Sequence, residues 1–517
     1  MNDKIVKNLN FGVDAKDKVF KGIEKLTKAV SSTLGASGKC VILEDNTGKP
    51  VITKDGVTVA DSIILLDPVE NMGATLLKEA ARKTVKEAGD GTTTATVLAH
   101  AILKEAYDLI DKSNERDVKN GILSGVNKIV DYLKYNSVSV TEDMIDQIAT
   151  ISTNNDPVLG KLIADAFRAV GETGVVIMEH SDGDETTFDI VEGVEYDKGL
   201  LNPNLITNKE KGTVELDNPL VLILDSKVES IRQIQSVLEY IIKSKRALFI
   251  IGEVETQVLS ALVMNKVKGN IKINIVDPPA FGLRRKEILE DLSLLTGAKI
   301  INETFGDDLN TIEVDYLGEC IKTTTDNDQT IIQVDSNSEE VEDIIKQIKK
   351  DLKNKLKPHQ VVGLEKRLAR LSAKVAIVKV GANSEVELKE KSDRVEDAIC
   401  ATKAAIKEGI VSGGGIALLN ASEKLDESIK GEMVLKKAIK YPYNTILSNA
   451  GIKHKEVGDV GFGLNVVTGN MVNMIDEGII DPLLVTKSAL INAASVATTI
   501  LSTDCVINNL RIDEGGR

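Results

Sequence analysis

The sequence predicts a multidomain α/β protein in which an α/β module is inserted into a mainly helical domain. The 517 residues correspond to about three domains of roughly 150 residues each. The first and last thirds carry apolar residues at helical spacing, whereas the middle third alternates short apolar runs with amphipathic stretches. Because the two ends resemble each other and differ from the middle, we expect one discontinuous domain that contains both ends.

The outer thirds show helix signals and two strand pairs. Val19, Ile23, Leu26 and Val30 recur on one helix face, and the helix should stop near Gly35. Further helices are expected over 70–88, 93–110, 117–134, 384–450 and 485–501. Strand pairs are expected at 40–43 with 50–53, and in the glycine-rich region 458–473.

The middle third predicts a parallel sheet. Apolar runs at 220–224, 247–251, 271–276 and 298–301 are separated by helical stretches. Such alternation is typical of parallel strands joined by right-handed crossovers. No G-x-G-x-x-G follows any of these runs, so a dinucleotide site is unsupported. Residues 338–372 predict two amphipathic helices that cover the sheet as an antiparallel hairpin.

Composition excludes several classes of protein. The net charge of −15 argues against nucleic acid or an anionic membrane as the main partner. Aromatic residues are 3% with no tryptophan, which argues against base-stacking platforms. The four cysteines and four histidines are scattered, so neither a zinc site nor a disulfide framework is expected. Without a signal-like start or a long uncharged apolar run, we expect no membrane span and a cytoplasmic location.

The sharpest motif is the run from Gly89 to Leu98, in which Gly89-Asp90-Gly91 precedes three threonines and an apolar helix. N–H groups at a helix N-terminus bind phosphate, and Asp90 could hold a Mg²⁺ ion that bridges phosphate oxygens. The alternative is an ordinary N-cap after a glycine turn. Three threonines are poor helix formers, which favours the anion site. No G-x-x-x-x-G-K-[S/T] occurs, so this is not a Walker-type site.

Three other loops are ambiguous when taken singly. Asp55-Gly56 follows a predicted strand and is typical of a turn. Gly413-Gly414-Gly415 follows a helix that includes Asp397, and reads as a helix C-cap or a close approach to a ligand. The loop 476–482 reads as a solvated turn.

Taken together, these loops resemble the ATP site of group I chaperonins of the GroEL type. The resemblance runs over essentially the whole chain, through 71–74, 281–286, 394–398, 413–418, 473–476 and 488–490. It implies an equatorial ATPase domain over 1–136 and 408–517, an intermediate hinge domain over 137–193 and 376–407, and an apical client-binding domain over 194–375.

The resemblance also implies roles for single residues. Asp90 matches the magnesium ligand, Gly91, Thr92, Thr93 and Thr94 match the phosphate loop, and Gly414, Asn465 and Asp481 match the ribose and base side. Thr33, Leu34, Gly35 and Lys54 match the opposing loops, and a potassium ion would lie with Thr33, Lys54 and Thr93. Asp55 and Asp397 match carboxylates near the γ-phosphate, and Asp397 would orient the attacking water once the hinge closes.

Two departures from the family fall in this site. Ala36 stands where the family has proline, and Val466-Val467 replace small residues beside the nucleoside. The chain therefore resembles a divergent member, either a paralogue or a virus-encoded copy that would work in the host cytoplasm.

The implied function is ATP-driven folding of non-native proteins; the alternative is a passive holdase with a weakened ATPase. Expected partners are unfolded clients, further copies in a heptameric ring, single or double, and a lid co-chaperonin. Clients would bind an exposed apolar strip made of Leu200, Leu205, Ile234, Leu238, Leu259, Val263 and Met264. Plain core packing is the alternative for these seven residues.

Overall fold

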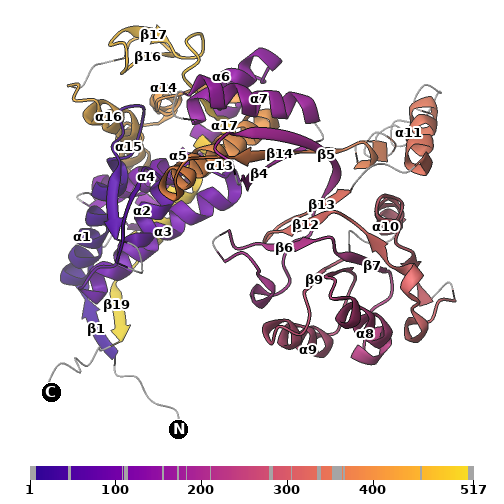
Figure 1. The fold of residues 1–517 in the computed structure, drawn as a ribbon. Helices are drawn as coiled ribbons and strands as arrows, with labels where there is room; N and C mark the ends of the chain where they lie inside the picture. Colours follow the sequence, from indigo (N-terminus) through magenta and orange to yellow (C-terminus); the bar gives the residue numbers. More distant parts are fainter. Residues whose placement is uncertain are drawn as a thin grey trace. The chain divides into compact units, whose positions relative to one another are not determined.

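The computed structural model describes residues 7–44, 48–107, 109, 115–153, 156–171, 174–181, 183–209, 211–278, 283–303, 306–334, 339–351, 364, 367–368, 370–453 and 457–509. The chain forms two compact units (Figure 1). Unit 1 comprises Met1–Asp165, His180–Thr187 and Lys379–Arg517, and unit 2 comprises Ala166–Glu179 and Phe188–Val378. The predicted insertion is thus confirmed. The three-domain boundaries stay a prediction.

Unit 1 is mainly helical, and its core is aliphatic. The central helix α17 (Leu483–Leu501) packs against α4 (Thr92–Tyr107) and α3 (Pro68–Ala88), and α1 (Gly12–Ser31) packs against α3. Ile23, Leu98 and Ile102 are fully buried in this core. The other helices are α2 (Gly56–Ser62), α5 (Glu115–Tyr135), α6 (Glu142–Ser152), α7 (Pro157–Val170, shared with unit 2), α13 (Glu385–Glu408), α14 (Ile416–Ala421), α15 (Lys430–Ala438) and α16 (Tyr441–Asn449).

Short antiparallel strand pairs complete unit 1. They are β2 (Val41–Glu44) with β3 (Pro50–Thr53), β15 (Ile410–Ser412) with β18 (Ile480–Pro482), β16 (Phe462–Leu464) with β17 (Met471–Asn473), and β1 (Lys7–Phe11) with β19 (Cys505–Asn509). The pairs at 40–53 and 458–473 were predicted. The pair β1–β19 was not predicted, and it places Lys7 opposite Asn509 within the domain that was expected to contain both ends.

Helix α17 has a composition that would suit a membrane span. Among the helices in the described ranges it alone is long and apolar enough, with a mean hydropathy of 1.4, and 61% of that span is buried inside the structure. A helix that lies at the centre of a helical core is apolar on most sides. Its contacts with α3 and α4 therefore account for its composition.

Unit 2 contains the predicted parallel sheet. Its order is β10-β7-β8-β9, from β7 (Leu220–Leu224), β8 (Leu248–Ile251), β9 (Ile273–Val276) and β10 (Ile300–Ile301). All pairs along this path are parallel. Helices α8 (Gln235–Ser244) and α9 (Thr256–Val267) lie on one face and α10 (Leu283–Thr296) on the other (Figure 1), as right-handed crossovers require when the chain reverses direction across the sheet.

A second sheet, mainly in unit 2, was not predicted. Its order is β4-β14-β5-β13-β12-β6, and the strands are β4 (Val175–His180), β5 (Thr187–Tyr196), β6 (Val214–Asp217), β12 (Lys322–Thr325), β13 (Thr330–Val334) and β14 (Lys374–Val380). Strand β11 (Gly318–Glu319) pairs with β7 of the first sheet. Of the predicted helical hairpin, α11 (Glu339–Asp351) is confirmed, and the second helix falls mostly outside the described residues. Its Leu364, Leu368 and Leu371 pack with Val341 and Ile348.

Candidate functional site

A cavity of about 810 Å³ in unit 1 collects the loops that the sequence singled out. This volume is within the usual range for small-molecule sites. Every residue predicted to contact the nucleotide borders it, namely Thr33, Leu34, Gly35, Ala36, Lys54, Asp55, Asp90, Gly91, Thr92, Thr93, Thr94, Asp397, Gly414, Asn465, Val466, Val467 and Asp481. Seven separate stretches of sequence thus meet at one place.

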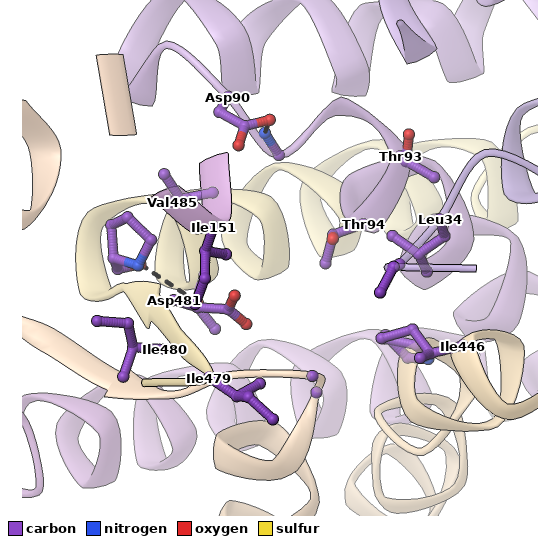
Figure 2. Close-up of a pocket in the computed structure, with 18 of the residues that line it drawn as sticks. Leu34, Asp90, Thr93, Thr94, Ile151, Ile446, Ile479, Ile480, Asp481 and Val485 are labelled. Carbon is purple, nitrogen blue, oxygen red and sulfur yellow. Dashed lines mark hydrogen bonds between the residues drawn. The ribbon is translucent and has the colours of Figure 1, made fainter. Parts of the chain in front are cut away.

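The predicted phosphate loop joins α3 to α4. Gly89 and Gly91 have φ angles of 74° and 95°, a left-handed region that favours glycine. A Cβ atom on Gly91 would also lie 2.8 Å from Val485 Cγ1. The first helical hydrogen bond of α4 is donated by Ala95 N–H to the Gly91 carbonyl, so the N–H groups before it have no partner within the helix. Figure 2 shows Asp90, Thr93 and Thr94 along this turn.

The opposing loop begins helix α2. The Asp55 carboxylate caps it, because its oxygens accept hydrogen bonds from Val57 N–H at 3.0 Å, from Thr58 N–H at 2.7 Å and from the Thr58 hydroxyl at 2.6 Å. A Cβ atom on Gly56 would lie only 2.4 Å from Thr93 Oγ1. The loops that carry Asp55 and Asp90 are therefore packed directly together.

Six acidic side chains border the cavity, namely Asp55, Asp90, Asp146, Asp397, Glu477 and Asp481. Burial, followed by the charges of Asp90 and Asp55, raises the pKa of Asp397 well above its usual value. Burial and then Asp55 raise the pKa of Asp90, against the opposing effect of its bond from Gly91 N–H. Burial and the Asp90 charge raise the pKa of Asp481 to about 7. A bound cation would stabilise the ionised form of all these groups.

Asp393 is a further acidic group, close enough to Asp55 to be affected by its charge, that the sequence did not predict. It lies one turn before Asp397 on α13, and burial and then Asp55 raise its pKa to about 6. The spacing of four residues on one helix could have revealed it, since such residues share a face.

The hairpin β16–β17 supplies the predicted base side. The Asn465 Oδ1 atom accepts hydrogen bonds from Val467 N–H at 3.0 Å and Thr468 N–H at 3.3 Å, so this side chain holds the turn. Val466 packs against the cluster of Ile416 and Tyr443. Val467 borders the cavity and is 71% exposed.

An apolar wall also lines the cavity, and only Leu34, Ala36, Val466 and Val467 of it were predicted from the sequence. It includes Ile151 from α6, Ile446 from α16 and Ile479 before β18. Figure 2 shows Leu34 near Ile446, and Ile151, Ile479 and Ile480 around Asp481. In a chain with many isoleucines, no local signal separates such wall residues from core residues.

The donor set limits how a metal could bind. Within the ranges described above, no group of three or more His, Cys, Asp or Glu side chains is arranged to hold a metal ion. Asp90, the carboxylate that the sequence predicts as the magnesium ligand, borders the cavity.

The predicted apolar client strip is wrong for three of its seven residues. Leu205 and Ile234 are 0% exposed and Val263 is 7% exposed, all in the core of unit 2. Leu200, Leu238 and Leu259 are partly buried against the same core, and Met264 is 56% exposed. The physical reason is that a helix face turned towards a sheet has the same apolar spacing as a face that binds a partner.

Comparison with known proteins agrees with the fold. A model of the TCP-1/cpn60 chaperonin family matches residues 26–511. The chain belongs to this family. Two crystal structures of the chaperonin gp146 from bacteriophage EL 2 (Pseudomonas aeruginosa), both in the presence of ATP-BeFx, are similar to this chaperonin. At 20% identity, crystal forms II and I have TM-scores of 0.73 and 0.65, and each match covers 97% of this chain and 99% of gp146.

Proposed function

We propose that this chaperonin binds Mg-ATP in the unit 1 cavity and hydrolyses it to drive the folding of non-native proteins. The observation that carries the proposal is the cavity itself. It combines a helix N-terminus rich in N–H groups with the carboxyl groups of Asp90, Asp55 and Asp397. The gp146 structures in the presence of an ATP analogue support nucleotide use by a protein of this fold.

The chain's own residues would divide the work. The N–H groups and hydroxyls of Thr92, Thr93 and Thr94 bind phosphate oxygens. Leu34, Ile151 and Ile479 cover the apolar faces of the nucleoside. A Mg²⁺ ion held by Asp90 would neutralise charge on the phosphates.

Asp397 would accept a hydrogen bond from the attacking water. Water then forms a bond to the γ-phosphorus while the bond to the bridging oxygen breaks, and ADP leaves. Asp55 is less suited to hold the water, because its carboxylate already accepts three hydrogen bonds within α2. We assign Asp55 an electrostatic role beside the phosphates.

Client capture would use the apolar side chains of unit 2 that are not fully buried. Among the predicted client residues, these are Leu200, Leu238, Leu259 and Met264. Assembly into a heptameric ring, single or double, action in the cytoplasm, and use of K⁺ and a lid co-chaperonin belong to the same proposal and rest on family membership.

The test measures phosphate release from Mg-ATP by the purified protein, together with aggregation of a denatured client. An active chaperonin should release phosphate, require Mg²⁺, and return the client to its native activity only when ATP is present. A passive holdase would suppress aggregation equally with and without ATP and release no phosphate. That second result would overturn the proposal.

A further inference from the structure

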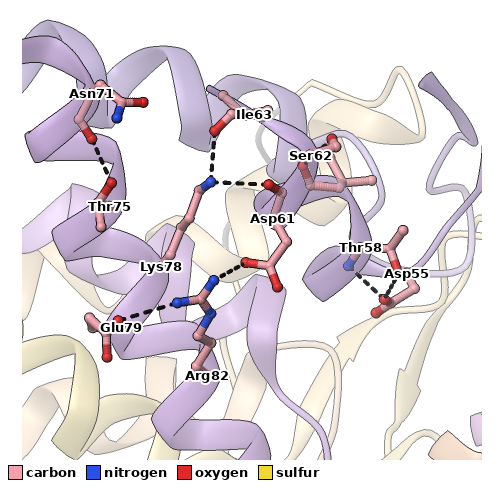
Figure 3. Close-up of polar contacts among 11 residues, drawn as sticks. Asp55, Thr58, Asp61, Ser62, Ile63, Asn71, Thr75, Lys78, Glu79 and Arg82 are labelled. Atoms are coloured by element: carbon pink, nitrogen blue, oxygen red, sulfur yellow. Dashed lines mark hydrogen bonds and ion pairs between the residues drawn. The ribbon is translucent and has the colours of Figure 1, made fainter. Parts of the chain in front are cut away.

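Lys78 is a buried cation within unit 1. Its side chain lies in the middle of α3, and the residue is 7% exposed. The ammonium donates hydrogen bonds to the carbonyl oxygens of Ile63 at 2.7 Å and Asp61 at 3.3 Å (Figure 3). Both acceptors belong to the backbone. Burial of an ammonium is costly unless it is well hydrogen-bonded, so this position implies a specific role.

The two carbonyls belong to the C-terminal end of α2, which has seven residues. The last carbonyls of a helix have no partner inside it and carry partial negative charge. Lys78 therefore caps α2 from the neighbouring helix. Arg82, one turn further along α3, adds a second link, because its Nη2 atom lies 2.8 Å from Asp61 Oδ1. Figure 3 shows both cations of α3 directed at the same helix end.

The opposite end of α2 lies in the cavity. Asp55 caps that end through both carboxylate oxygens, so the place of this carboxylate is set by the place of α2. Gly56 also lies directly against Thr93. A shift of α2 along its axis would move Asp55 relative to the phosphate loop.

Helix α3 ends at Ala88, immediately before Gly89 and Asp90. One rigid helix thus carries Lys78 at its middle and leads into Asp90 at its end. Through Lys78, the same helix also holds α2 and its cap Asp55. Helix α3 therefore positions both Asp90 and Asp55.

We propose that Lys78 is a positioning residue of the nucleotide site, which fixes Asp55 relative to Asp90 by anchoring the C-terminal end of α2. The proposal rests on the proposed ATPase function for its effect on turnover. The anchoring itself is a property of the fold and can be measured without nucleotide.

The test compares Lys78→Met with Lys83→Met in the full-length protein. Methionine retains the apolar stem and removes the donors. Lys83 is the matched control, since it lies on the same helix, is largely exposed and pairs only loosely with Glu87 at 3.8 Å. Deuterium uptake over residues 55–64 should become about tenfold faster or more in Lys78→Met, and remain unchanged in Lys83→Met. Uptake equal to wild type in Lys78→Met would overturn the anchoring.

Turnover gives the second measurement. Lys78→Met should lower kcat for ATP about tenfold, because small displacements of catalytic groups are costly, with ATP affinity within about twofold of wild type. The double variant Asp55→Asn/Lys78→Met should be no slower than Asp55→Asn alone, since Lys78 acts through Asp55. A double variant that is slower than Asp55→Asn alone would contradict positioning. So would equal losses of ATP affinity and turnover in Lys78→Met. If the wild type releases no phosphate, the ATPase proposal fails while the deuterium uptake still decides the anchoring.

Discussion

The nucleotide cavity of unit 1 and the apolar helices of unit 2 were predicted by the same reasoning, with different success. All the predicted cavity residues border one space, whereas three of the seven predicted client residues are buried in a core. Most of the predicted cavity residues are glycines, threonines and aspartates, which core packing does not demand. Six of the seven client residues are leucine, isoleucine or valine, which core packing demands everywhere. Polar motifs therefore led to one cavity, whereas apolar periodicity identified only an apolar face.

The largest effect on stability should come from a polar substitution at a predicted client residue that is buried. Ile234→Ser removes an apolar side chain from a fully buried position and adds a hydroxyl there. We expect a loss of about 3–4 kcal/mol in the free energy of unfolding of unit 2, measured by denaturant titration. Met264→Ser, at an exposed position on α9, is the matched variant and should change stability by less than about 0.5 kcal/mol. Equal stability losses in the two variants would show that the burial difference is wrong.

Asp90→Ala should affect nucleotide binding rather than folding. The variant removes the one carboxylate that we assign to the cation, and loss of such a ligand should weaken Mg-ATP binding about 100-fold. Because it also removes negative charge from a buried cluster, the stability of the nucleotide-free protein should not fall. Calorimetric titration with ATP at low and high Mg²⁺ checks both statements. Mg-ATP affinity equal to that of wild type would show that Asp90 does not hold the cation.

A smaller effect concerns the pH dependence of stability. The pKa of Asp481 is raised from 3.8 to about 7, so the native state holds a proton that the unfolded chain releases. Native stability without nucleotide should therefore fall as pH rises from about 4 to about 7. Asp481→Asn should flatten this decline and raise Tm at pH 8 by about 3 °C. Thermal scans from pH 5 to pH 8 test it, and a steeper decline in the variant would contradict the raised pKa.

The parallel sheet of unit 2 and the loops of the cavity could be predicted from the sequence. The second sheet and most of the apolar wall of the cavity could not. Strands β7, β8 and β9 are continuous apolar runs separated by helices, so local pattern suffices to find them. Strands β4 and β14 lie about 200 residues apart in the sequence, and β12 reads Lys-Thr-Thr-Thr. Pairing between such segments depends on contacts that no local pattern encodes. Ile151 and Lys78 were missed for a related reason, since their roles come from neighbours distant in sequence.

The central claim is that the unit 1 cavity is a hydrolytic nucleotide site in which Asp397 orients water. The most direct measurement compares ATP binding with phosphate release in Asp397→Asn, with Glu385→Gln, in the exposed first turn of the same helix, as the control. We expect Asp397→Asn to bind Mg-ATP within about twofold of wild type and to release phosphate about 10²–10³ times more slowly, while Glu385→Gln matches wild type. Phosphate release by Asp397→Asn at the wild-type rate would contradict the claim.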